Sequence, residues 1–175
     1  MRRMDFTIRT ARPDDYETLG EITVRAYRDD GFLAFGEDDE YADLLRDVAG
    51  RAADAEVLVA ADEAGTVLGG VTFTTGDGKW ADIAGPDEAE FRMLAVGHEG
   101  RGRGVGEALV RACVERARAV PGCARIVLST QQSMAGAHRI YARVGFVRAP
   151  ERDWQPLPGV DFTLLAYALE LGNTP

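Results

Sequence analysis

The sequence predicts a single mixed α/β domain built around a central sheet. Segments with alternating apolar and polar side chains, which are typical of strands, lie between segments whose apolar residues recur at helical spacing. Residues 90–118 combine both patterns, because an alternating strand leads through a glycine-rich turn into an amphipathic helix. The chain has 175 residues, a length that favours one core, so we expect residues 1–175 to form one domain.

The chain is expected to begin with a strand and two helices. Residues 5–10 alternate as a strand does. Pro13 and the two aspartates after it indicate a helix start, because proline is tolerated in the first turn and acids are favoured at the positive end of the helix dipole. This helix should end near Asp29, and an apolar stripe predicts a second helix over residues 38–51.

Three strands are expected next. Residues 56–61 and 67–74 are joined by a short loop that ends at Gly65, which predicts a hairpin. Residues 75–89 hold three glycines and one proline and should form a loop. Residues 90–96 form the next strand, and a helix follows from residue 105 to about residue 118.

The last third alternates between the two element types. Pro121 and Gly122 end the preceding helix, and residues 125–130 are a buried-strand pattern. A helix is expected over residues 133–144, stopped by Gly145. Two closing strands, 146–152 and 162–169, complete the order βααβββαβαββ, which is that of a mixed sheet.

The glycine-rich turn after residue 96 has the composition of an anion site. Residues 97–106 contain five glycines and two arginines. The first turn of a helix has unpaired N–H groups and the positive end of the dipole, and glycines leave those donors open to a phosphate. A Walker loop is excluded because no lysine is near, and no register fits the dinucleotide pattern G-x-G-x-x-G.

The pattern that does fit is Arg101-x-x-Gly104-x-Gly106, which resembles the pyrophosphate loop of the GNAT superfamily, the acyl-CoA-dependent N-acyltransferases. A second match lies farther along the chain, where AHRIYARVGF at residues 137–146 resembles the family's A-x-x-L-Y-x-K-x-G-F helix ending. The resemblance extends over nearly the whole chain. It implies the GNAT fold, a mostly antiparallel sheet splayed between its fourth and fifth strands and flanked by about four helices.

The resemblance also implies a cofactor, acetyl-CoA, lying in that splay as the cosubstrate. The main chain of Leu94 and Val96 would pair with its pantetheine arm, and an N–H near Ala95 or Val96 would donate to the oxyanion. The pyrophosphate would lie on the amides of six residues, Arg101, Gly102, Arg103, Gly104, Val105 and Gly106.

The family's catalytic pair falls on Glu90 and Tyr141. Attack by an amine on a thioester needs a base to take the amine's proton and benefits from an acid at the leaving thiolate, and the resemblance assigns these roles to Glu90 and Tyr141. The residues alone leave alternatives open. Glu90 should share a strand face with Arg92, Leu94 and Val96, where it could form a surface ion pair. Tyr141 could be a core tyrosine.

One position departs from the family pattern. An asparagine is common three residues before the motif alanine, and this chain has Met134, which cannot donate a hydrogen bond. One of residues 131–133 is a candidate substitute. His138, one turn farther on, is expected to be a surface or cofactor-adjacent residue. The two histidines and two cysteines lack metal-ligand spacing, so no metal site is expected.

The acceptor pocket is expected between the first two helices, the loop before residue 90 and the closing hairpin. Its candidate wall residues are aromatic: Tyr27, Phe32, Phe35, Tyr41, Trp80 and Trp154. Its candidate ammonium partners are acidic: Asp29, Asp30, Glu37 and Asp38. The predicted reaction is direct acetyl transfer in a ternary complex to a small primary amine, with a protein N-terminus or lysine as the second choice. The alternative is a GNAT-fold module that binds CoA without turnover.

The charge distribution separates an acidic first part, which suits a cationic partner, from a basic middle. Residues 1–91 hold 9 basic and 22 acidic residues, net −13, whereas residues 92–152 hold 11 and 4, net +7. An acidic chain disfavours nucleic acid as a partner, while the basic middle suits a polyanionic cofactor. The sequence contains no membrane-length apolar run and no signal-peptide pattern, so a cytoplasmic protein without membrane contact is expected. The resemblance also allows a homodimer.

Overall fold

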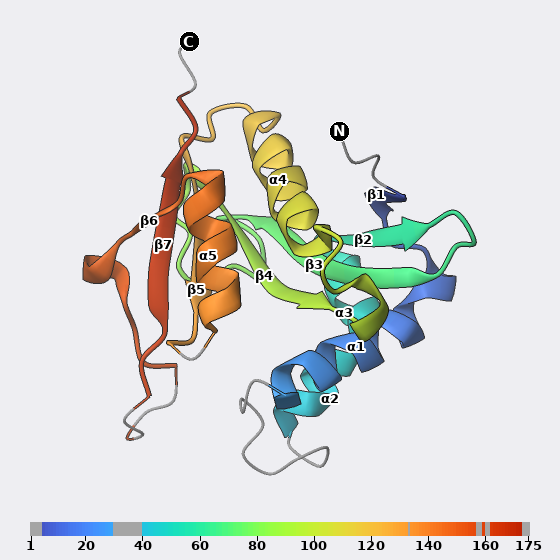
Figure 1. The fold of residues 1–175 in the computed structure, drawn as a ribbon. Coiled ribbons are helices and arrows are strands. Elements are labelled where there is room, and N and C mark those ends of the chain that lie inside the picture. The colour runs from blue at the N-terminus through green and yellow to red at the C-terminus, as the bar shows by residue number, and fades with distance from the viewer. Residues whose placement is uncertain (1–4, 30–39, 133, 157–158, 160–161, 173–175) are drawn as a thin grey trace.

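The computed structural model describes residues 5–29, 40–132, 134–156, 159 and 162–172. Its centre is a seven-stranded sheet with the order β1-β2-β3-β4-β5-β7-β6, antiparallel except between β4 and β5 (Figure 1). The strands are β1 (Phe6–Thr10), β2 (Glu56–Asp62), β3 (Val67–Thr75), β4 (Glu88–Val96), β5 (Arg125–Thr130), β6 (Val147–Arg148) and β7 (Leu165–Glu170). The predicted mixed sheet is thereby confirmed.

Helices cover both faces of the sheet. They are α1 (Tyr16–Asp29), α2 (Glu40–Arg46), α3 (Val48–Asp54), α4 (Val105–Arg118) and α5 (Ala135–Val144). Alternate residues of β2 show the two faces, because Leu58 packs in the same cluster as α4 residues and Val59 packs in the cluster of α1 and α3. Helices α4 and α5 therefore lie on one face and α1, α2 and α3 on the other (Figure 1).

Several expected boundaries were wrong, among them the start of the last strand, which begins at Leu165 and not at residue 162. The single helix over residues 38–51 is two helices, because the Asp47 carboxylate accepts a hydrogen bond from the N–H of Gly50 at 3.0 Å and starts a new helix there. The strand over residues 146–152 is only β6, since Pro150 has no N–H for sheet pairing and begins a short 3-10 turn. Strand β4 begins at Glu88, two residues before its expected start.

The sheet opens between β4 and β5. These strands pair only through Glu88 with Arg125, Ala89 with Ile126 and Glu90 with Val127. Beyond Glu90, β4 stays paired with β3, and β5 stays paired with β7. The two halves of the sheet therefore diverge after three paired positions and leave one edge of β4 facing a gap, which we call the splay.

A bulge in β4 changes which side chains face each helix layer. The pairing of β3 with β4 shifts register between Gly70 and Thr72, and Met93 has a φ of 58°, rare for a residue with a side chain. Met93 packs in the cluster that contains residues of α1 and α2, whereas Leu94 packs in the α4 and α5 cluster. The expectation that Glu90 shares a face with Leu94 and Val96 was therefore wrong, because the bulge reverses the alternation.

Glu88 anchors the closed end of the splay. It is 5% exposed and its carboxylate contacts the guanidinium groups of Arg125 and Arg152 at 2.6 Å each. Hydrogen bonding to Arg152 is the main cause that lowers the pKa of Glu88 to about 2. The carboxylate thus stays charged near neutrality and ties β4, β5 and the turn at residues 150–152 together.

Candidate active site

The turn before α4 leaves main-chain amides uncovered. Gly102 and Gly104 have φ values of 73° and 80°, the left-handed region that favours glycine, and a Cβ built on either would meet nothing within 4 Å. The first hydrogen bond of α4 runs from the N–H of Ala108 to the Gly104 carbonyl at 3.0 Å. The N–H groups of residues 105–107 therefore have no carbonyl partner within the helix. N–H groups at the start of a helix that lack a partner within the helix favour an anion.

The side chains of this turn are directed elsewhere. Arg103 donates to Asp5 at 2.6 Å and to the Glu99 carbonyl at 3.1 Å. Arg101 lies 3.8 Å from Asp29 at the end of α1. Val105 is a core residue, and a Cβ on Gly106 would lie 3.0 Å from Ile140 of α5. The predicted loop thus offers backbone donors, with arginine charge nearby.

Strand β4 has a free edge next to this turn. Ala95 and Val96 pair with Gly70 and Gly69 of β3, and the opposite edge of the strand faces the splay. Leu94 also lies in the part of β4 that is not paired with β5. An extended ligand can pair with such an edge as an added strand would.

Glu90 lies at the last paired position before the splay, on the face opposite its neighbour Phe91. Its side chain is 0% exposed, and Oε1 accepts hydrogen bonds from the N–H groups of Asp82, Ile83 and Ala84 at 2.9, 2.9 and 3.0 Å. Oε2 has no hydrogen-bond partner among the described residues. Burial raises the pKa of Glu90 above its usual value, although the three N–H groups oppose that shift.

Tyr141 lies on the other face. It is 4% exposed, with its ring centroid 5.8 Å from that of Phe91 and 5.7 Å from that of Tyr167. Burial raises the pKa of Tyr141, and a hydrogen bond with Thr130 near the end of β5 partly offsets this. The structure therefore places Glu90 and Tyr141 on opposite faces of the sheet, both on strands or helices that border the splay.

A small pocket of about 50 Å³ lies in the splay. Its wall is formed by Arg92 and Met93 of β4, by Ser129 and Thr130 of β5, and by Tyr27, Tyr41, Asp82, Gln131, Met134 and Leu164. Of the expected wall residues, Tyr27 and Tyr41 line the pocket. Trp80 contacts the pocket residue Arg92 through its ring, and Trp154 Nε1 donates a hydrogen bond to the pocket residue Ser129 at 2.9 Å. Phe32, Phe35, Asp30, Glu37 and Asp38 lie outside the described residues.

Asp82 and Arg92 are pocket residues that sequence reasoning missed. Arg92 Nε lies 3.1 Å from Asp82 Oδ2, and the two side chains are 19% and 28% exposed. A signal was present, because an arginine within a largely buried strand needs an anionic partner. The expected ammonium partner Asp29 lies instead beside Arg101 and His98.

Met134 and His138 have ordinary contacts at the start of α5. The Thr130 hydroxyl lies 3.7 Å from the Met134 sulfur, and His138 Nε2 lies 2.8 Å from the Gln131 carbonyl. Among the described residues, no group of three or more histidine, cysteine or acidic side chains could hold a metal ion. Within the same residues, no helix is long and apolar enough to cross a membrane.

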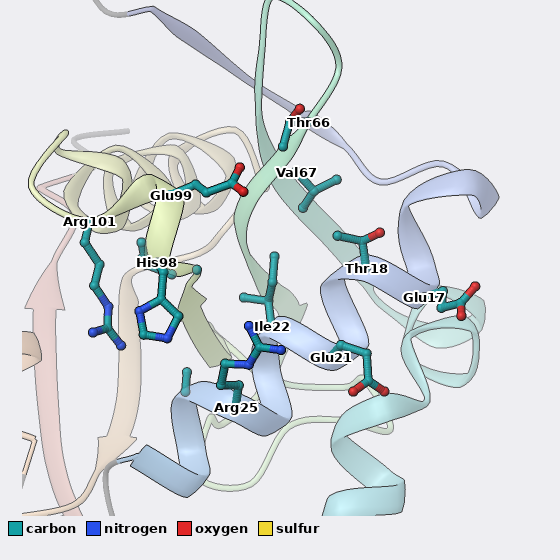
Figure 2. A pocket seen from close by; sticks show the side chains of 13 residues that line it. Glu17, Thr18, Glu21, Ile22, Arg25, Thr66, Val67, His98, Glu99 and Arg101 are labelled. Atoms are coloured by element: carbon teal, nitrogen blue, oxygen red, sulfur yellow. The ribbon is translucent and has the colours of Figure 1, made fainter.

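A larger cavity of about 400 Å³ lies on the α1 side of the 97–101 turn. Figure 2 shows His98 and Arg101 on one side of it and Glu17, Glu21 and Arg25 of α1 on the other. Its lining mixes both signs of charge and shares Arg101 with the predicted pyrophosphate loop.

Comparison with known proteins identifies the same architecture. The family model described as "Acetyltransferase (GNAT) family" matches residues 16–146. The structure of yncA, a putative acetyltransferase from Salmonella typhimurium with acetyl-CoA, has a TM-score of 0.68 at 21% identity, covering 97% of this chain and 96% of that one. A GNAT superfamily phosphinothricin acetyltransferase from Sinorhizobium meliloti, in complex with AcCoA, has a TM-score of 0.66 at 20% identity, covering 97% and 90%. No curated protein sequence matches this chain significantly.

Proposed function

The chain belongs to the GNAT acetyltransferase family, and on that premise we propose that it acetylates a small primary amine by direct attack in a ternary complex with acetyl-CoA. Acetyl-CoA is the cosubstrate. The observation that carries the proposal is the splay itself, where an open edge of β4 leads directly to the bare amides at the start of α4. A pantetheine arm along Leu94 and Val96 would end on that anion site with its pyrophosphate.

The reaction needs three groups around the thioester. A base takes a proton from the ammonium group, and the neutral amine nitrogen bonds to the thioester carbonyl carbon. The carbon–sulfur bond then breaks, and the departing thiolate takes a proton from an acid. A main-chain N–H near Ala95 or Val96 is our oxyanion donor, since β4 is open there to the splay. A primary amine, and a protein N-terminus or lysine as the second choice, would enter through the small pocket.

Glu90 is our base, acting through a water molecule. Its Oε2 has no hydrogen-bond partner in the described part of the chain, and burial raises the pKa of Glu90 above that of an exposed glutamate. Tyr141 is our acid, with its hydroxyl beside Thr130 at the border of the splay. A thioester lying in the splay would have one of these residues on each face of the sheet.

A specific observation favours the competing function, a module that binds CoA without turnover. The Glu90 carboxylate is completely enclosed and accepts hydrogen bonds from the N–H groups of residues 82–84, a structural role that requires no proton transfer. Calorimetry with CoA and acetyl-CoA, followed by a thiol-release assay over a panel of amines, separates the two functions. We expect binding of both and acceptor-dependent release of CoA. Binding with no release for any amine would establish the module instead.

Tyr141→Phe tests the proposed acid. Phenylalanine preserves the packing against Phe91 and Tyr167 but has no proton to donate, so kcat should fall about 10- to 100-fold or more. The dissociation constant for CoA, measured by calorimetry, should stay within about twofold because the hydroxyl is not expected to touch the pyrophosphate. Unchanged kcat would remove Tyr141 from the chemistry and leave it a core residue.

A further inference from the structure

We propose that the acceptor carries an anionic group, such as a carboxylate, next to its amine, as an α-amino acid does. Arg92 would bind the anionic group and Asp82 would bind the ammonium group. The inference rests on the proposed acetyl transfer and names the substrate class of that same site. Its basis is the presence of one cation and one anion, in contact with each other, in the wall of the pocket in the splay.

The Arg92 guanidinium is held on several sides. Nε contacts Asp82, Nη1 donates to the Trp80 carbonyl at 3.1 Å, and the guanidinium carbon lies 6.0 Å from the centre of the Trp80 ring. The Tyr41 hydroxyl also hydrogen-bonds to Arg92. These contacts orient the guanidinium before any ligand arrives. Arginine has five N–H donors, so the N–H groups that remain are suited to bind a carboxylate.

The charge of the pocket selects against a simple amine. Asp82 alone would favour any ammonium group, but Arg92 beside it would repel a diamine or an alkylamine that offers only positive charge. An acceptor with a carboxylate adjacent to its amine matches both residues, the carboxylate on Arg92 and the ammonium on Asp82. A peptide N-terminus has a neutral carbonyl at that position and would offer Arg92 no negative charge.

The size of the pocket agrees with this group. A volume of about 50 Å³ holds about four water-sized groups, close to the amine, α-carbon and carboxylate of one amino acid. The volume is filled by these groups, so the side chain of the acceptor would extend out of the pocket.

The experiment compares matched acceptors in the thiol-release assay. L-alanine, L-leucine and L-phenylalanine are each tested with the corresponding amide and decarboxylated amine. We expect kcat/KM to be about 10- to 100-fold higher for the acid than for the amide or the amine, because only the acid pairs with Arg92. Equal values within each set would overturn the inference while leaving acetyl transfer intact.

Variants assign the preference to Arg92. Arg92→Gln should abolish the preference for the acid, mainly through KM, whereas Arg92→Lys should keep part of it because the charge remains and the fork is lost. The control is Arg118→Gln, since Arg118 pairs with Glu115 on the surface of α4 away from the pocket. A preference that survives in Arg92→Gln would overturn the assignment, provided that CoA affinity and thermal unfolding show the variant to be folded.

If no acceptor leads to release of CoA, calorimetry still distinguishes the proposed acetyl transfer from the proposed recognition by Arg92. The protein saturated with CoA is titrated with L-leucine and with L-leucinamide. Binding of L-leucine alone, lost in Arg92→Gln, would support the inference although acetyl transfer had failed. Binding of neither compound, or of both equally, would overturn it.

Discussion

Replacing Glu90 with glutamine should lower kcat by about 10²- to 10⁴-fold, the range that a general base contributes, while the protein stays folded. The substitution is suited to this residue because its two oxygens have different surroundings. Oε1 accepts hydrogen bonds from three main-chain N–H groups, and the carbonyl oxygen of a glutamine can accept the same three bonds. Oε2 is the unpaired atom to which we assign the proton.

The pH profile gives the prediction its sign. A base acts only when deprotonated, so kcat/KM of the wild-type enzyme should rise as the pH increases through the pKa of Glu90. That rise should occur above the usual glutamate range, because burial raises the pKa of Glu90. Glu90→Gln should show a low rate without this rise.

Glu90→Ala provides the structural control. Alanine removes both oxygens and leaves the N–H groups of residues 82–84 without their acceptor, so it should lower the unfolding temperature as well as the rate. If Glu90→Gln retains nearly full activity while Glu90→Ala loses it, Glu90 is an anchor for the 82–84 segment, and the base lies elsewhere.

Gly104→Trp should reduce affinity for CoA by at least about 100-fold. An indole at this position would cover the amides at the start of α4, and loss of several charge-assisted hydrogen bonds has an effect of that order. The open space around Gly104 means that the side chain meets no protein atom within 4 Å of its Cβ. The left-handed φ of 80° adds about 1 kcal/mol of strain for a residue with a side chain.

Gly122→Trp is a matched control that separates the effect of backbone strain from the effect of covering the amides at the start of α4. Gly122 has a similar φ of 76° and an equally open surrounding, but it lies beyond the far end of α4. Gly122→Trp should therefore show a similar loss of thermal stability and unchanged affinity for CoA by calorimetry. Equal affinity in the two variants would remove the 101–106 turn from the cofactor site.

Local patterns predicted the parts of the molecule that depend on neighbours in sequence. The strand, turn and helix from Glu88 to Arg118 and the α5 motif could be predicted because their periodicity and glycines act within a few residues. The break at Asp47 was missed, although an N-cap residue was visible, because the apolar stripe continued across it. The strand expected over residues 146–152 was too long because the prediction ignored Pro150, which lacks the N–H group needed to continue a strand.

The details of the site depend on contacts between distant segments. The bulge at Met93 arises from the pairing of β3 with β4, and a regular alternation had placed Glu90 and Leu94 on one face. Asp82 lies in the loop that was expected to border the acceptor pocket, but it was not singled out, because nothing local shows that this loop returns to cover Glu90 and to meet Arg92. The two new pocket residues thus became visible only in three dimensions.

The short pairing of β4 with β5 divides the sheet into two parts that meet at three paired positions. One part contains β1 to β4, and the other contains β5 to β7. Continuous hydrogen bonding between β4 and β5 would have closed the passage between the two faces of the sheet. The interruption lets a molecule bound in the splay contact residues from both faces, and such a molecule would bridge the two parts of the sheet where their strands are not paired.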